Sequence, residues 1–262
     1  MKLQSLALLL VLISVAANAQ EDITKLYQEK VFSKNGYALP YRIMYPKNFN
    51  PKQKYPIIFV LHGSGERGSD NLKQLTHGAS MFASDSVRDK FPAIIVFPQC
   101  EADGYWANVK KNQDDKGFTS FQFFPEEKST KSMEQLIKLV KKLSHEKYVD
   151  RKRVYVGGLS MGGMGTFEII SREPKIFAAA FPICGGSDPK AVKKYSKKIN
   201  IWIFHGEMDD IVSPEYSKAM YQAIQANGNN VKITLYPNTN HNSWDKAFKE
   251  PELLPWLFSN SK

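Results

Sequence analysis

The sequence contains no basic arm interleaved with aromatic residues, although Lys and Arg outnumber Asp and Glu by 36 to 26. Its lysines are scattered, mostly as pairs such as Lys141 and Lys142, which is typical of a solvated surface. Proteins that bind nucleic acid usually concentrate positive charge in a patch or along a helix. We therefore expect no nucleic-acid partner.

Internal repeats, low-complexity tracts and signs of a second domain are also missing. The 262 residues are 42% hydrophobic and 12% aromatic, which is enough to close one sizeable core. We expect residues 20–262 to form a single domain.

Long hydrophobic runs are absent after the first twenty residues. In that first segment, Lys2 precedes an apolar stretch over residues 6–15, and a small-residue cleavage site ends at Ala19. This pattern predicts a secretory signal peptide over residues 1–19 and a secreted or periplasmic protein. The residue directly after the predicted cleavage point is Gln20 and not a cysteine, so we expect no lipid or membrane anchor.

Short apolar strands alternate with helical patterns along the rest of the chain. Continuous apolar strands of this kind indicate a mostly parallel sheet with helices on both faces, which is an α/β fold. Helices are predicted over residues 133–143, from Pro214 to Ile224 and over residues 253–258. The predicted strands are residues 30–33, 39–45, 57–61, 93–97, 154–156, 178–183, 201–204 and 231–236.

Residues 100–128 interrupt this rhythm and are unusually rich in aromatic side chains. Long irregular segments in compact domains usually serve a function. We expect part of this segment to pack as a wall over the end of the sheet that carries the site.

A Gly-x-Ser-x-Gly motif from Gly158 to Gly162 stands between a predicted strand and a predicted helix. In that context the motif is typical of a nucleophile elbow, a sharp turn that lifts a serine hydroxyl above the sheet. The pentapeptide alone is a weak signal in a chain with 16 glycines. The strand before it and the helix after it favour Ser160 as a nucleophile.

A serine nucleophile needs a base and an acid that orients the base. Such partners follow a nucleophile elbow in the chain order serine, acid, histidine. His241 lies in a loop after the last predicted strand and is therefore the expected base. The other strand-end histidines, His62 and His205, are expected to organise loops, and His145 to end a helix.

The acid is expected at Asp209, because a His-Gly-x-x-Asp-x-x-Val pattern directly after a predicted strand places it there. Asp210 and Asp188 are the alternatives. The oxyanion of acyl transfer also needs donors in fixed positions. We expect these to be the backbone N–H of Met161 and the N–H of Ser64, with Gly65 as the alternative to Ser64.

Five segments of the chain together resemble one known family. The family is the α/β-hydrolase group called dienelactone-hydrolase-like or "predicted peptidase". It is similar to the feruloyl and acetyl-xylan esterases of carbohydrate esterase family 1 and to polyhydroxybutyrate depolymerase-like esterases. One departure is that dienelactone hydrolases themselves use a cysteine where this chain has Ser160. The segments are residues 61–68, 97–100, 150–154, 158–163 and 205–209.

The resemblance covers residues 31–258 and implies an eight-stranded sheet in the order 1-2-4-3-5-6-7-8, with the first strands antiparallel. It places Gln99 and Trp106 near an acyl pocket, with core packing as the alternative for Trp106. It also implies a structural ion pair between Glu66 and Arg67 beneath the oxyanion loop.

The chain has only two cysteines, Cys100 and Cys184. In the implied sheet order their strands lie three places apart, roughly 14 Å at ~4.8 Å per strand. A disulfide needs Cα atoms within about 7 Å. We therefore expect two separate buried thiols.

These residues together predict a secreted serine carboxylesterase that forms an acyl-enzyme. Its expected substrate is a small ester or an ester-decorated polysaccharide, with feruloyl or acetyl esters of plant polysaccharide as candidates. No metal and no cofactor is expected. The alternatives are a serine peptidase of the prolyl-oligopeptidase type and a non-catalytic binding protein on the same scaffold.

Overall fold

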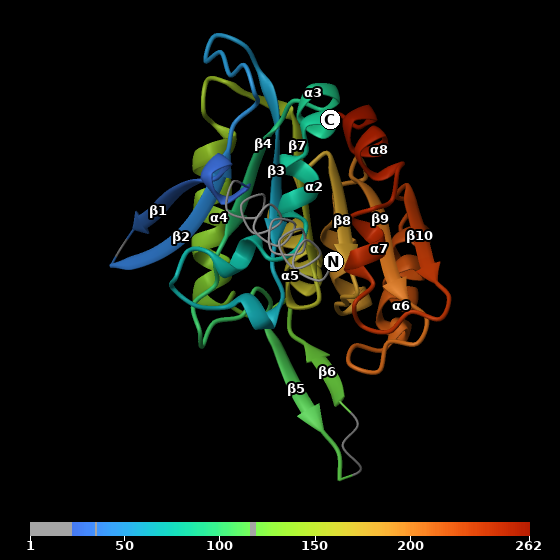
Figure 1. The fold of residues 1–262 in the computed structure, drawn as a ribbon. Coiled ribbons are helices and arrows are strands. Elements are labelled where there is room, and N and C mark those ends of the chain that lie inside the picture. Colours follow the sequence, from blue (N-terminus) through green and yellow to red (C-terminus); the bar gives the residue numbers. More distant parts are fainter. Residues whose placement is uncertain (1–22, 35, 116–118) are drawn as a thin grey trace, which may run out of the picture.

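An eight-stranded sheet forms the centre of the protein in the computed structural model, which describes residues 23–34, 36–115 and 119–262 (Figure 1). The predicted signal peptide lies outside the described residues. The strand order is β1-β2-β4-β3-β7-β8-β9-β10, which confirms the expected topology. The strands are β1 (Gln28–Lys34), β2 (Tyr37–Met44), β3 (Tyr55–Leu61), β4 (Ile94–Pro98), β7 (Val149–Leu159), β8 (Ala179–Ile183), β9 (Asn200–Gly206) and β10 (Val231–Tyr236).

The strand directions follow from how the chain connects them. β1 pairs antiparallel with β2, and β2 pairs antiparallel with β4. All remaining neighbours, from β4 to β10, pair parallel. Because parallel strands point the same way, the loops that follow β3, β7, β9 and β10 open at one edge of the sheet, where ligands bind in open α/β sheets.

Helices cover both faces of the sheet. Every residue of β3, β4 and β8 is buried, which explains why these strands are continuously apolar. One face packs against α4 (Lys131–Ser144), α5 (Met161–Arg172) and α6 (Pro214–Ala226). The other face packs against α2 (Ala79–Ala83), α3 (Asp85–Lys90), α7 (Trp244–Ala247) and α8 (Leu253–Ser259).

Local capping agrees with the predicted helix starts. The Thr130 hydroxyl accepts a hydrogen bond from the backbone N–H of Met133 at the start of α4. The Ser213 hydroxyl caps α6, whose first residue is Pro214. Caps of this kind satisfy backbone donors that the first turn of a helix leaves free. In the described part of the chain, no helix is both long enough and apolar enough to span a bilayer.

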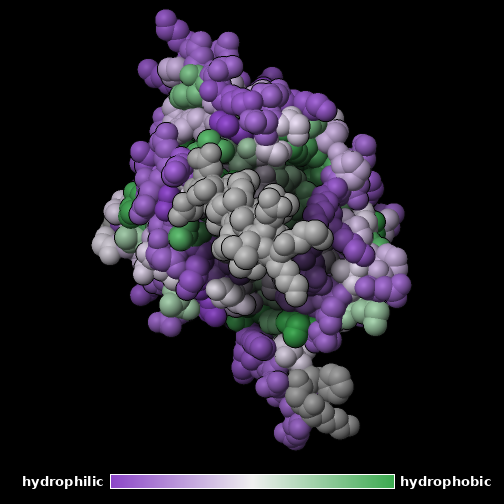
Figure 2. Space-filling view, viewed as in Figure 1, coloured by the Kyte–Doolittle hydropathy of each residue, from purple (hydrophilic) through white to green (hydrophobic). Residues whose placement is uncertain are grey.

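The aromatic-rich segment contains a hairpin that sequence patterning did not predict. Its strands, β5 (Val109–Gln113) and β6 (Thr119–Phe123), form a separate two-stranded sheet that extends from the body of the molecule (Figure 1). Its outer surface is largely hydrophilic in Figure 2. The Tyr216 side chain of α6 holds the hairpin through edge contacts with Phe121 and Phe123, and its hydroxyl accepts the backbone N–H of Phe121.

Both cysteines are buried and free, as expected. Cys100 follows β4 and Cys184 follows β8, three places away in the sheet. Burial raises the pKa of the Cys100 thiol to about 11 and raises the pKa of the Cys184 thiol further. Both residues are therefore protonated packing residues at neutral pH.

Replacement of Phe59 tests the packing of the central strand β3. Its ring is fully buried in β3, and we expect Phe59→Ala to lower the free energy of unfolding by about 3–5 kcal/mol through lost contacts and a residual cavity. Urea unfolding followed by circular dichroism measures the loss. Lys52→Ala, at the exposed approach to the same strand, is the control and should change stability by less than about 0.5 kcal/mol. A loss below 1 kcal/mol for Phe59→Ala would contradict this packing.

Candidate active site

Ser160 occupies a strained turn between β7 and α5. Its backbone has φ of 52° and ψ of −115°, a combination that residues other than glycine rarely adopt. The turn fits only because of its glycines. A Cβ added at Gly162 would lie 2.0 Å from the carbonyl oxygen of Leu61, and one at Gly158 would lie 2.5 Å from the same atom.

Three side chains from different loops form a continuous series of hydrogen bonds. His241, in the loop after β10, lies with its Nε2 2.9 Å from the Ser160 hydroxyl. Its Nδ1 lies 2.8 Å from Oδ2 of Asp209, in the loop after β9. Because the carboxylate can only accept, Nδ1 carries the proton and Nε2 is left to accept from the serine. The loops after β7, β9 and β10 thus bring these residues together.

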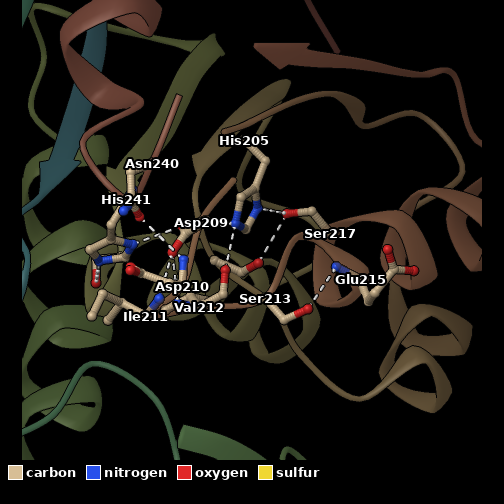
Figure 3. A network of polar contacts seen from close by, with 12 residues as sticks. His205, Asp209, Asp210, Ile211, Val212, Ser213, Glu215, Ser217, Asn240 and His241 are labelled. Carbon is tan, nitrogen blue, oxygen red and sulfur yellow. Dashed lines mark hydrogen bonds and ion pairs between the residues drawn. The ribbon is translucent and has the colours of Figure 1, made fainter. Parts of the chain in front are cut away.

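The Asp209 side chain is fully buried and is held by four hydrogen bonds. Its Oδ1 accepts the backbone N–H groups of Ile211 and Val212. Its Oδ2 faces His205 at 3.1 Å and His241 at 2.8 Å, from two sides (Figure 3). Burial alone would raise the pKa of Asp209, but the hydrogen bonds outweigh burial and hold the pKa well below its usual range.

The other two carboxylates considered for this position lie elsewhere. Asp210 is exposed, and its backbone N–H donates to the Asn240 side chain. Asp188 caps a short 3₁₀ helix over residues 189–194 by accepting the backbone N–H of Lys190. Neither is the carboxylate bonded to His241.

His62 fixes the loop that follows β3. The backbone N–H of Cys100 donates to Nε2 of His62, so the ring proton is on Nδ1 and donates to the carbonyl of Gly63 at 2.6 Å. Burial lowers the pKa of His62 to about 4, which keeps the ring neutral at neutral pH. The Glu66 carboxylate accepts the Gly63 N–H. Both polar groups of Gly63 are therefore occupied, and a Cβ at Gly63 would lie 3.7 Å from the Ser160 Cβ.

The structure corrects two expectations from the family resemblance, for the Glu66–Arg67 pair and for Gln99, and it decides between the two alternatives for Trp106. Glu66 binds the Gly63 N–H and lies 3.6 Å from His77, while Arg67 donates to the carbonyls of Ser64 and Gly104. The expected Glu66–Arg67 ion pair is therefore wrong. The two side chains instead bind different backbone groups: Glu66 accepts the Gly63 N–H, and Arg67 donates to the Ser64 carbonyl.

Gln99 and Trp106 are both fully buried, so the structure does not place either side chain where a substrate could reach it. The Gln99 amide accepts the Asn71 N–H and donates to Asp70 and to the Glu66 carbonyl. Gln99 thus ties down the chain that follows the 3₁₀ turn over residues 64–66. Trp106 packs edge-on against His62, with ring centroids 5.4 Å apart, which is the core-packing alternative.

One group of potential metal ligands lies within the described residues. Ligand atoms of Cys184, Asp209 and His241 lie within 4.8 Å of one another. A cysteine binds metal as a thiolate, whereas burial raises the pKa of Cys184 far above its ordinary value. Asp209 and His241 already use the relevant atoms in their mutual hydrogen bond. The chemistry of this set suits a hydrogen-bonded series better than a metal centre.

Sequence reasoning missed the outer support of His241. The indole of Trp244 contacts the His241 ring edge-on, with centroids 5.3 Å apart, and it also contacts the ring of His77, with centroids 5.2 Å apart. Trp244 lies three residues after His241, a proximity that the sequence displays. His77 is 164 residues before His241 in the chain (241 minus 77), and no local pattern connects them.

The chain is similar in sequence and in fold to several known proteins. A family profile described as Phospholipase/Carboxylesterase matches residues 48–251. The crystal structure of a thermostable esterase is 34% identical with a TM-score of 0.81, and the match covers 92% of this chain and 64% of that chain.

Two curated proteins are more distant. A bifunctional acetylxylan esterase/xylanase of Neocallimastix patriciarum is 25% identical over 169 residues, which is 64% of this chain and 21% of that protein. A probable dipeptidyl-aminopeptidase B of Ajellomyces capsulatus is 23% identical over 255 residues, covering 85% of this chain and 26% of that protein. The chain therefore spans about a quarter or less of the length of these curated relatives.

The lowered pKa of Asp209 predicts a dependence of stability on pH. Because the folded-state pKa lies below the unfolded value of about 3.9, the stabilisation is complete above that pH and is lost as the pH falls toward the folded value. Between about pH 4 and about pH 2, the free energy of unfolding of the wild type should fall more steeply than that of Asp209→Asn. Urea unfolding at each pH measures both slopes, which cannot differ by more than about 1.4 kcal/mol per pH unit for one proton. Parallel slopes would contradict the assigned hydrogen bonds.

Proposed function

Because the chain belongs to the phospholipase/carboxylesterase family, we propose that it is a serine hydrolase that cleaves carboxylic esters. The observation that carries this proposal is the unbroken series from the Ser160 hydroxyl through His241 to the buried carboxylate of Asp209. A serine hydroxyl becomes an effective nucleophile only when a base can take its proton. This arrangement supplies the base and the group that orients it.

The reaction proceeds in two halves. In the first, His241 Nε2 takes the proton of Ser160 while the serine oxygen attacks the ester carbonyl. The imidazolium then gives this proton to the departing alcohol, and an acyl-enzyme remains. In the second half, His241 activates water, which releases the acid and restores the serine. Asp209 holds the imidazole in the required tautomer and stabilises its charged form.

The oxyanion is assigned to the backbone N–H groups of Ser64 and Met161. Met161 is the first residue of α5, so its N–H has no acceptor within the helix. The N–H of Ser64 belongs to the same trans peptide unit as the Gly63 carbonyl, which points to His62. In a trans peptide the carbonyl and the following N–H point in opposite directions. The Ser64 N–H is thereby directed away from His62, on the loop that lies beside Ser160.

The proposed substrate is an ester carried by a plant polysaccharide, with an acetyl or feruloyl acyl group. Support comes from the match to an acetylxylan esterase/xylanase and from the family resemblance of the motifs. A secreted or periplasmic location, proposed from the leader pattern over residues 1–19, would give the enzyme access to such a polymer.

A serine peptidase is the second candidate, favoured by the similarity to probable dipeptidyl-aminopeptidases. The two functions are separated by assaying the purified protein on methyl ferulate and acetylated xylan, and in parallel on short proline-containing peptides. Ester turnover without peptide turnover is expected. The reverse result would assign the chain to the peptidases.

The catalytic assignment is tested by three variants assayed with p-nitrophenyl acetate. Ser160→Ala should lower kcat by about 10⁴-fold or more, because the nucleophile is absent. Asp209→Asn should lower kcat by about 10⁴-fold, because the amide oxygen keeps the two backbone N–H groups and the amide NH₂ then faces Nδ1, which favours the wrong imidazole tautomer. Asp210→Asn, an exposed neighbour, is the matched control and should retain wild-type kcat. Equal losses in the two Asp variants would refute the choice of Asp209, and a kcat close to that of the wild type in Ser160→Ala would refute the nucleophile.

The role of His62 gives a separate prediction. Removing its hydrogen bond to the Gly63 carbonyl frees the peptide unit that carries the Ser64 N–H. We expect His62→Phe to lower kcat by about 10²-fold, the usual effect of losing one oxyanion donor, with little change in KM. His145→Phe, at an exposed helix end, is the control and should keep the wild-type constants. A raised KM with an unchanged kcat would contradict this role.

A further inference from the structure

A groove with a volume of about 380 Å³ opens beside Trp244, which contacts His241, between two segments that are far apart in the chain. One segment runs through α2 and the other through α7, and both helices pack on the same face of the sheet (Figure 1). The segments meet where Gly78, with φ of 82°, lies against the ring of Phe248 at a distance that leaves no room for a Cβ. The lining residues are Thr76, His77, Gly78, Ser80, Met81, Trp244, Asp245, Phe248 and Lys249.

One residue, Trp244, connects the groove with His241. Trp244 lines the groove and also contacts the His241 ring, with centroids 5.3 Å apart and planes at 86°. The Trp244 ring also contacts the ring of His77, another residue of the groove, with centroids 5.2 Å apart. His77 lies 3.6 Å from Glu66, whose carboxylate also holds the Gly63 N–H. The wall of the groove is therefore continuous with both His241 and the oxyanion loop.

The position of the groove decides which part of an ester can occupy it. Resting on the proposed function, the imidazole of His241 must protonate the departing alcohol oxygen, so that oxygen lies close to Nε2 in the transition state. The carbonyl oxygen faces the Ser64 and Met161 amides instead. A group that extends from the alcohol oxygen past His241 meets Trp244. We propose that this groove is the alcohol subsite and that it binds a sugar.

The chemistry of the lining favours a sugar over a hydrocarbon alcohol. Trp244 and Met81, both partly exposed, offer apolar surface on which the C–H face of a pyranose ring can pack. The rim offers hydroxyls from Thr76 and Ser80, and charges from Asp245 and Lys249, all of them exposed.

Polar rim groups of this kind pair well with sugar hydroxyls. The Asp245 Oδ2 accepts from Asn242, which leaves Oδ1 able to accept from a ligand. Among the described residues, the Lys249 ammonium has no ion-pair partner within 4.0 Å and keeps its donors for a ligand. Covering these charges with a long alkyl chain would cost their hydration without replacing it.

The groove also continues beyond the space that one sugar ring fills. A second groove of about 300 Å³ shares Thr76 and Ser80 with the first and runs on toward Ile23 and Leu72. An oligosaccharide bound at the first groove can therefore extend along the surface. The subsite thus fits an ester carried on a sugar chain better than one carried on a single small alcohol.

The binding test uses xylotriose, an unesterified sugar, so that it does not depend on catalysis. Calorimetric titration of the full-length protein should give saturable binding. Ser80→Phe, which fills the groove, and Asp245→Ala, which removes an acceptor, should each weaken that binding at least tenfold. Lys52→Ala, at the opposite end of β3, is the control and should bind like the wild type. Absence of binding to the wild type, or equal binding by all variants, would overturn the subsite.

A kinetic test uses two esters with the same acyl group, acetylated xylotriose and p-nitrophenyl acetate. In Ser80→Phe, the ratio of kcat/KM for the first ester to kcat/KM for the second should fall at least tenfold, and an unchanged ratio would overturn the proposal. Thermal melting of each variant shows whether it is folded. If the wild type cleaves neither ester but binds xylotriose at this groove, the proposed function fails, and of the proposal only the sugar-binding groove remains. If it cleaves p-nitrophenyl acetate and does not bind xylotriose, the subsite fails alone.

Discussion

The close approach between the end of β3 and the start of α5 is the constraint on which the site depends. Gly158 and Gly162 both face the carbonyl of Leu61 at distances that exclude any side chain. The strand that leads into the oxyanion loop and the strand that carries Ser160 can therefore end side by side. A larger residue at either glycine would separate the two backbone segments that, in the proposed mechanism, act on the same carbonyl group.

The charge on the Asp209 carboxylate is also held in place by its surroundings. A buried carboxylate is costly unless hydrogen bonds replace its lost hydration, and Asp209 receives them from two backbone amides and two histidines. The proposed alcohol subsite lies elsewhere, on exposed side chains of the groove such as Ser80 and Asp245. Preference for one alcohol over another can therefore change without disturbing the groups that perform the chemistry.

Strands and helices that depend on local sequence patterns were predicted from the sequence. The eight main strands and the helices α4, α6 and α8 were apparent from apolar runs and helical spacing, whereas the order of the strands and the antiparallel first strands were implied by the family resemblance. The β5–β6 hairpin was missed because Val109–Gln113 is mostly polar and lacks a clear alternation. Gln99 was misplaced because its partners, such as Asn71, lie 28 residues away in the chain. The groove was invisible for the same reason, since His77 meets Trp244 only in three dimensions.

The state of the two thiols has a practical consequence. Alkylating reagents attack thiolates at solvent-accessible positions, whereas Cys100 and Cys184 are enclosed and protonated. The native fold therefore offers an almost silent background for maleimide chemistry. A single cysteine introduced on an exposed position of the β5–β6 hairpin could carry a fluorophore or a spin label without removal of the native pair.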